Sequence, residues 1–244
     1  MVTCVGSHTE VIELLLTRPD IKINKETPTP RGWTALFFAG HMDNKEIVEI
    51  LLKHLKIDIN HQDRAGYTTL IYAASKGFAE VVETLLDDGV DPKIEDDQGG
   101  RAIQRAIDAD KYAVIKLLLQ RNVEYNFRDT LGRSLLYSAA CNSRTGIIRL
   151  LLQTCQDLDI NAQGSDGVTA LHDSIRFNYL ETTKGLLEFS ARTNIPNNAG
   201  RTPVRSAKDA GRTHILKVLQ RARENKVRPI HKADTFKVDS EIPL

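Results

Sequence analysis

Apolar and polar positions along this chain follow a pattern that returns about every 33 residues. The clearest copy starts at Gly66: Thr68 comes two residues later, then the apolar pair Leu70 and Ile71, and then a second apolar block, VVETLL (81–86). In that block the apolar residues fall at i, i+1, i+4 and i+5, which is the spacing of one buried helix face. The pattern predicts two short helices separated by a tight turn and followed by an extended loop.

Six full copies of this pattern follow one another. They begin near Gly32, Gly66, Gly99, Gly132, Gly167 and Gly200, at intervals of 34, 33, 33, 35 and 33 residues. In five copies a hydroxyl residue stands where the first helix begins, and a side-chain oxygen there can cap the helix; these residues are Thr34, Thr68, Ser134, Thr169 and Thr202, with Arg101 as the exception. Residues that tolerate left-handed backbone stand where the first helix must stop, namely Asp43, Gly77, Asp110, Ser143, Asn178 and Gly211.

Repetition has a physical reason. Isolated helices shorter than ~12–15 residues are marginal in water, and each predicted helix is shorter than that. One unit cannot bury its own apolar face, whereas stacked copies bury a continuous core. The sequence therefore predicts an elongated array of stacked helix pairs.

The repeated residues resemble the ankyrin repeat family. Its helix-opening tetrapeptide is matched by TALF (34–37), TTLI (68–71), TALH (169–172) and TPVR (202–205), and its second-helix signature by SHTEVIELLL (7–16). The asparagine that closes the family's loop stands at Asn24, Asn60, Asn126, Asn161 and Asn194, with Lys93 as the outlier. The resemblance implies an all-α, ankyrin-repeat solenoid of stacked helix-turn-helix pairs with projecting hairpin loops.

Three segments are expected from this resemblance. Residues 1–31 form a partial N-terminal repeat with a second helix and loop only, residues 32–223 form six repeats, and residues 224–244 form a polar tail. Because the first unit lacks its first helix, we expect the native chain to continue upstream. The fifth full unit holds Thr182, Thr183 and Gly185 where another unit has Val, Val and Thr, so we expect a weak interface there.

The composition and charge of the chain exclude several classes of function. The 33 basic and 32 acidic residues nearly cancel, so no overall field favours nucleic acid or an anionic membrane. No apolar run is long enough to span a bilayer, and the first residues do not form a signal peptide. The three cysteines do not suggest a disulfide framework. We expect an intracellular protein, cytoplasmic or nuclear, that binds neither nucleic acid nor membrane.

Motifs of catalysis are absent from the sequence. It contains no P-loop, no G-x-G-x-x-G after a strand and no H-E-x-x-H, and its seven histidines do not pair with cysteines at metal-binding spacing. His172 is interpreted as a helix-capping residue, and Cys141 and Cys155 as small apolar fillers. We expect no enzymatic activity, no cofactor and no metal.

The resemblance places the binding residues on the concave side, next to the unit glycines and at the end of each first helix. The resulting candidates are Arg31, Trp33, His41, Met42, Arg64, Tyr67, Lys76, Asp108, Arg133, Asn142, Arg176 and Phe177. Among these, Trp33, Tyr67 and Phe177 are favoured, because exposed large aromatics are unusual without a partner. Trp33 and Tyr67 occupy the same position in adjacent repeats, directly after the unit glycine. We therefore expect them to lie side by side, bordered by basic residues. The alternative is that Trp33 packs on Pro28 or Pro30.

The sequence therefore predicts a non-enzymatic protein-protein interaction module, expected to be a monomer. Its leading role is the recognition arm or scaffold segment of a larger signalling or regulatory protein. The alternative is a free-standing inhibitor or targeting subunit that covers an enzyme or transcription factor. The identity of the protein partner does not follow from the sequence, because one scaffold hosts many partners.

Overall fold

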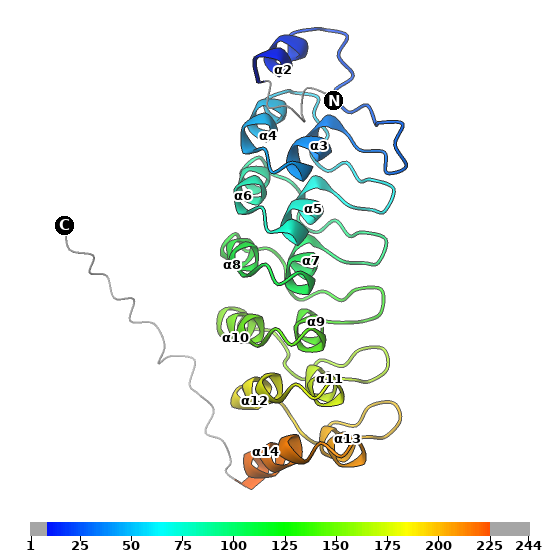
Figure 1. Ribbon diagram of the computed structural model, residues 1–244, viewed down its shortest axis with the longest axis vertical. Helices are drawn as coiled ribbons and strands as arrows, with labels where there is room; N and C mark the ends of the chain where they lie inside the picture. The colour runs from blue at the N-terminus through cyan, green and yellow to red at the C-terminus, as the bar shows by residue number, and fades with distance from the viewer. Residues whose placement is uncertain (1–8, 225–244) are drawn as a thin grey trace, which may run out of the picture.

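The computed structural model describes residues 9–224 as two parallel rows of short helices with loops projecting from one side (Figure 1). The first row holds α3 (Ala35–His41), α5 (Thr69–Lys76), α7 (Ala102–Asp108), α9 (Leu135–Cys141), α11 (Ala170–Arg176) and α13 (Pro203–Asp209). The second row holds α2 (Thr9–Leu16), α4 (Lys45–Leu52), α6 (Ala79–Asp87), α8 (Tyr112–Gln120), α10 (Thr145–Thr154), α12 (Leu180–Glu188) and α14 (Thr213–Glu224). The tail expected over 224–244 lies outside the described residues except for its first residue.

The helices of the first row begin at the predicted caps. The side-chain oxygens of Thr34, Thr68, Ser134, Thr169 and Thr202 each accept a hydrogen bond from a backbone N–H in the first turn of the helix that follows. Arg101 makes no such bond, as expected from its side chain. Each cap satisfies a donor that would otherwise be orphaned at the helix start.

The turn between the two helices of each pair depends on one left-handed residue. Asp43, Asp110, Ser143 and Asn178 have φ values of 55°, 60°, 56° and 62°, and Gly77 and Gly211 hold the same slot with φ values of 87° and 65°. Only glycine adopts this backbone without cost, and asparagine and aspartate tolerate it better than other residues. The predicted helix stops are thus confirmed in all six full units.

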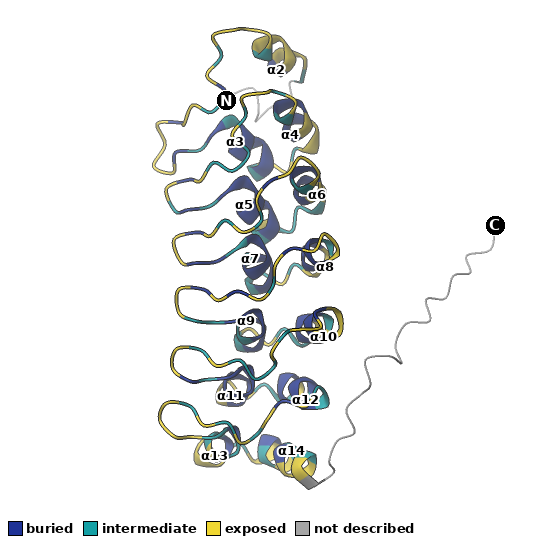
Figure 2. Ribbon diagram, turned by 180° about the vertical axis from the view of Figure 1, so that it is seen from behind, coloured by how far each residue is buried: buried dark blue, intermediate teal, exposed yellow. Residues whose placement is uncertain are grey.

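The core lies between the two rows of helices and runs the length of the stack (Figure 2). In the second full unit, Leu70 and Ile71 from α5 meet Val81, Val82 and Leu85 from α6, and each of these side chains is at most 1% exposed. The same layer recurs in the neighbouring units, so the core is continuous across the repeats.

The loops fold into hairpins that are tied to one another. At the root of one hairpin, the N–H of Asp63 donates to the carbonyl of Tyr67 at 2.8 Å, and Asp96 and Gly100 do the same in the next unit at 3.0 Å. Asn60 bridges adjacent repeats, because its Oδ1 accepts the N–H of Asp91 at 2.9 Å. Asn24 and Asn161 make the equivalent bonds to Asp58 and Arg192.

The first described helix, α2, is poorly covered. Ile12 is its buried residue, whereas Val11, Leu14 and Leu15 are 44%, 69% and 36% exposed. Because few apolar contacts hold this helix, we expect its amides to exchange with deuterium before those of any other second-row helix. Hydrogen-exchange mass spectrometry measures this directly, and protection of α2 equal to that of α6 would contradict the prediction.

The fifth full unit differs from the expectation of a plain weak interface. Thr182 and Thr183 are fully buried, and their hydroxyls are paired. The Oγ1 of Thr182 lies 2.9 Å from the Oγ1 of Thr145 on α10, and the Oγ1 of Thr183 lies 2.9 Å from the Oγ of Ser174 on α11. These hydrogen bonds offset part of the stability that is lost because threonine buries less apolar area than valine.

Gly185 in α12 is the basis of a stability prediction. A Cβ at this position would lie 3.3 Å from the Cγ2 of Thr145, which is tight. Gly185→Ala alone is therefore expected to change the free energy of unfolding by less than about 0.5 kcal/mol, because the gain in helix propensity of about 1 kcal/mol is offset by this contact. In a Thr145→Ser background, which removes Cγ2 and keeps the hydroxyl, the full gain of about 1 kcal/mol is expected. Urea unfolding of the four proteins measures both values, and equal effects of Gly185→Ala in the two backgrounds would contradict this explanation.

Within residues 9–224, no helix has the length and apolar character needed to cross a membrane.

Candidate protein-binding surface

The face formed by the first-row helices and the hairpins begins with a cluster of aromatic rings. Trp33 stacks on Phe37 at 4.9 Å between ring centroids, meets the edge of Phe38 at 5.1 Å and packs against His41 at 4.7 Å. Tyr72, from the next unit, stacks on His41 at 4.9 Å. We call Trp33, Phe38, His41 and Tyr72, together with the exposed Met42, the aromatic patch.

The predicted Trp33–Tyr67 pair is not what the structure shows. The aromatic neighbours of Trp33 are the rings above and Tyr72, at 6.4 Å, and Tyr67 packs against the core instead. The indole N–H of Trp33 donates to the buried carboxylate of Asp63 at 3.2 Å. The contacts of the ring with α3 and with Asp63 in the following hairpin hold it in place, and the alternative contact with Pro28 or Pro30 stays a prediction. Trp33 is half-buried, so its ring both packs within the first full repeat and forms part of the surface.

Basic side chains border the aromatic patch. Arg31 lies over the Trp33 ring at 5.9 Å and Lys76 lies over the Tyr72 ring at 5.3 Å. Burial lowers the pKa of His41, and the charges of Lys76 and Arg31 lower it further, so His41 is neutral at pH 7. Arg64 is tied to the preceding hairpin, because its Nη1 donates to the carbonyl of Pro30 at 3.4 Å.

The middle of the face is occupied by ion pairs. Arg105 on α7 donates to both carboxylate oxygens of Asp96, at 2.5 and 2.7 Å, and to Asp108 at 3.3 Å. Burial raises the pKa of Asp108 despite this arginine. Tyr67 lies within the electrostatic reach of the same group, and its pKa is raised, mainly by burial. The charge of Asp108 is therefore already engaged within the protein.

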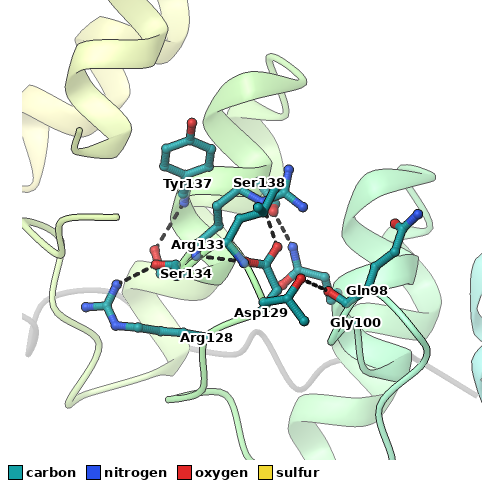
Figure 3. A network of polar contacts seen from close by, with 12 residues as sticks. Gln98, Gly100, Arg128, Asp129, Arg133, Ser134, Tyr137 and Ser138 are labelled. Carbon is teal, nitrogen blue, oxygen red and sulfur yellow. Dashed lines mark hydrogen bonds and ion pairs between the residues drawn. The ribbon is translucent and has the colours of Figure 1, made fainter. Parts of the chain in front are cut away.

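The fourth full unit contributes polar groups that the protein itself satisfies (Figure 3). The Nε of Arg133 donates to Asp129 at 2.6 Å at the root of the hairpin. The side chain of Asn142 donates to the carbonyl of Ser138 at 3.0 Å, at the end of α9. Both predicted residues have a structural partner.

The far end of the face holds the last predicted pair. Phe177 is 44% exposed and stacks on Tyr179 at 5.8 Å. Arg176 lies 5.4 Å over the Phe177 ring and reaches within 4.0 Å of Asp173. These residues lie at the end of α11, far along the stack from α3 and α5, beside which the aromatic patch lies (Figure 1).

One row of the face was missed by the sequence analysis. It is the sixth position after each unit glycine, within the first-row helices, and it holds Phe38, Tyr72, Arg105, Ser138, Asp173 and Ser206, of which Ser138 and Asp173 are buried. The 33-residue register aligns these residues, so a column-by-column comparison could have found them. They were not among the candidates, because the binding positions that the family resemblance implies lie next to the unit glycines and at the ends of these helices.

The site chemistry does not favour catalysis. His172 uses both ring nitrogens structurally: Nδ1 accepts from the N–H of Thr169 at 3.2 Å, and Nε2 lies 3.0 Å from the carbonyl of Arg201. This confirms its predicted capping role. Burial raises the pKa of the Cys155 thiol to about 11 and raises that of Cys141 as well, so neither is an activated nucleophile. Among residues 9–224, no group of three or more His, Cys, Asp and Glu side chains is arranged to hold a metal ion.

Comparison with known proteins agrees with the architecture of helix pairs and hairpins. A family model for ankyrin repeats (3 copies) matches residues 1–96, 100–197 and 136–229. The chain therefore belongs to the ankyrin repeat family. The ankyrin repeat domain of Bcl-3, described as a unique member of the IkappaB protein family, has the same fold, with a TM-score of 0.80 over 90% of this chain and 96% of that domain at 22% identity.

Curated relatives match only a part of this chain. They include human BCL-6 corepressor-like protein 1, 29% identical over 138 residues (57% of this chain and 8% of that protein), and Neurogenic locus notch homolog protein 1 of Xenopus tropicalis, 30% identical over 146 residues (59% and 6%). Mouse Inversin is 28% identical over 161 residues, which is 65% of this chain and 15% of that protein. The matched region is thus a small part of each relative. Ankyrin repeats are protein-interaction modules, and this class includes the present chain.

Proposed function

We propose that the chain is a non-enzymatic recognition arm or scaffold segment of a larger signalling or regulatory protein, and that it binds a protein partner at the aromatic patch. The observation that carries this proposal is the patch itself. Four ring-bearing side chains from two adjacent repeats, Trp33, Phe38, His41 and Tyr72, pack together beside two cations, and Met42, which follows His41 in the chain, is 46% exposed. An aromatic centre with a charged rim is the usual anatomy of a protein-binding hot spot.

The rim charges indicate the kind of partner. Arg31, Arg64 and Lys76 are exposed and all positive. They favour a partner segment that presents an apolar anchor with acidic residues beside it, because complementary charges guide association. The short share of each relative that this chain matches supports the role as one segment of a longer protein.

Site-specific photo-crosslinking in cells tests the proposal. A benzophenone amino acid replaces Met42 in one protein and Tyr112 on the second-row helix α8 in the other; the native residues are 46% and 49% exposed, so the two positions are matched. We expect a discrete crosslinked protein at position 42 that is absent at position 112 and that is reduced by Lys76→Glu. Equal crosslinking at both positions would overturn the proposal. A crosslinked enzyme or transcription factor that the isolated chain inhibits would favour the inhibitor role instead.

A further inference from the structure

A pocket of about 460 Å³ lies between α11 and α13, at the opposite end of the face from the aromatic patch. It is separate from the aromatic patch, and the sequence analysis did not predict a cavity here. Its lining includes Val168, Asp173, Arg176, Arg201, Asp209 and Ala210.

The lining of this pocket includes a buried carboxylate with an unused acceptor. The Asp173 side chain is 1% exposed. Its Oδ2 accepts from the Cys141 thiol at 3.0 Å, and the Tyr137 hydroxyl also faces the carboxylate. Its Oδ1 has no hydrogen-bond partner among the described residues. The nearest cation, Nη1 of Arg176, is 4.0 Å away, which is too far for a hydrogen bond. A buried acceptor in this state is costly, so a donor that reaches it is favoured.

Positively charged side chains lie at the mouth of the pocket. Arg176 and Arg201 are both exposed there. The other acid of the lining, Asp209, is engaged by Arg205, whose Nε lies 2.8 Å from Oδ1 of Asp209. An incoming cation would meet the two guanidinium groups, and an incoming carboxylate would meet Asp173, so both charged forms are disfavoured. A neutral group that donates at one end and accepts at the other fits both.

We propose that this pocket binds the carboxamide side chain of a glutamine or asparagine on the protein partner. The amide N–H donates to Oδ1 of Asp173, and the amide oxygen accepts from the guanidinium of Arg201, while Val168 and Ala210 contact the methylenes. Arg176, whose side chain is 71% exposed, turns outward to admit the group. The inference rests on the proposed function in placing the partner along this face, and it adds a polar contact near the end of the stack opposite the aromatic anchor.

Small-molecule probes test the pocket without a partner protein, so the result is independent of crosslinking at position 42. Propionamide, propylammonium and propionate are each titrated into the ¹⁵N-labelled chain, and backbone amide shifts are followed by NMR. We expect saturable shifts only with propionamide, confined to the lining residues. Saturation by propylammonium or by propionate would overturn the proposal. So would the absence of saturation with all three, because Arg176 would then simply close over Asp173.

Variants assign the two hydrogen bonds. Asp173→Leu removes the acceptor and is expected to abolish the propionamide shifts. Arg201→Ala changes an exposed residue, leaves the fold intact and is expected to weaken propionamide binding by about tenfold. Arg176→Ala is expected to retain binding, and Arg149→Ala on the second-row helix α10 is the matched control with no effect. Unchanged binding by Arg201→Ala would contradict the proposed orientation even if Asp173→Leu fails to fold.

Discussion

Replacing Asp96 by alanine is expected to lower the free energy of unfolding by about 3 kcal/mol, the usual cost of breaking a buried ion pair by removing one partner. The Asp96 side chain is 1% exposed, and that of its partner Arg105 is 12% exposed. Asp96 also accepts the backbone N–H groups of Gln98 and Gly100, at 2.9 and 3.0 Å. Alanine would leave an arginine poorly paired and two amides unsatisfied at the root of the hairpin. Urea unfolding at neutral pH measures the loss.

The same carboxylate makes stability depend on pH. Burial acts to raise the pKa of Asp96, but the hydrogen bonds from Arg105, Gly100 and Gln98 and the charge of Arg105 outweigh it, so the pKa is lowered. A lowered pKa stabilises the fold above the unfolded-state value of about 3.9, and this contribution is lost as the pH falls below it. The difference between the native protein and Asp96→Ala should therefore shrink in acid. Asp97→Ala, at the exposed neighbouring position, is the control and should change stability by less than about 0.5 kcal/mol. A difference that stays constant down to strongly acid pH would contradict the assignment.

Replacing Trp33 by alanine is expected to weaken both folding and binding, by about 2 kcal/mol each. The effect on folding is expected because the indole is half-buried against Phe37 and Phe38 and donates to Asp63. Removing it opens a gap in the first full repeat and leaves Asp63 with one donor fewer. Thermal or urea unfolding and titration of the crosslinked partner measure the two effects.

A conservative variant separates the two roles of Trp33. Trp33→Phe keeps an aromatic ring and loses the N–H, so it should cost about 1 kcal/mol of stability and retain most of the binding. Tyr112→Ala on α8 is the control for a general loss of an exposed aromatic residue. A Trp33→Ala protein with an unchanged unfolding midpoint would show that the packing described for this ring is wrong.

Local features of this protein were predictable because they are set by short-range chemistry. The capping oxygens of Thr34 and Thr68, the left-handed stops at Asp43 and Asn178, and the asparagine bridges at Asn24 and Asn60 each depend on a few residues at fixed spacing. Repetition then determines the global fold, since a unit that cannot bury its own apolar face must stack on its neighbours. The division into six repeats from Gly32 to Gly200 therefore follows from the pattern itself.

The candidate surface was only partly predictable, because it depends on which side chains from different repeats meet. Trp33 and Tyr67 share a slot, yet Trp33 meets Tyr72 across the interface between the first two full repeats. Asp108 and Arg133 occupy expected surface slots, yet each is paired inside the protein. The position of a residue within its repeat predicts where its side chain lies on the fold. Its contact partner depends instead on the size and charge of neighbours about 33 residues away in the sequence.

By itself, the sequence determined the repeat architecture, the helix boundaries and the class of interaction module, because the periodic burial of apolar residues and the backbone preferences of capping and turn residues are local properties. Only the tertiary structure decided that the aromatic rings gather at α3 and α5, that the central charges are paired, and that Asp173 has an unused acceptor in the lining of a pocket. These features arise between repeats, where side chains distant in the sequence compete for the same space and the same hydrogen bonds.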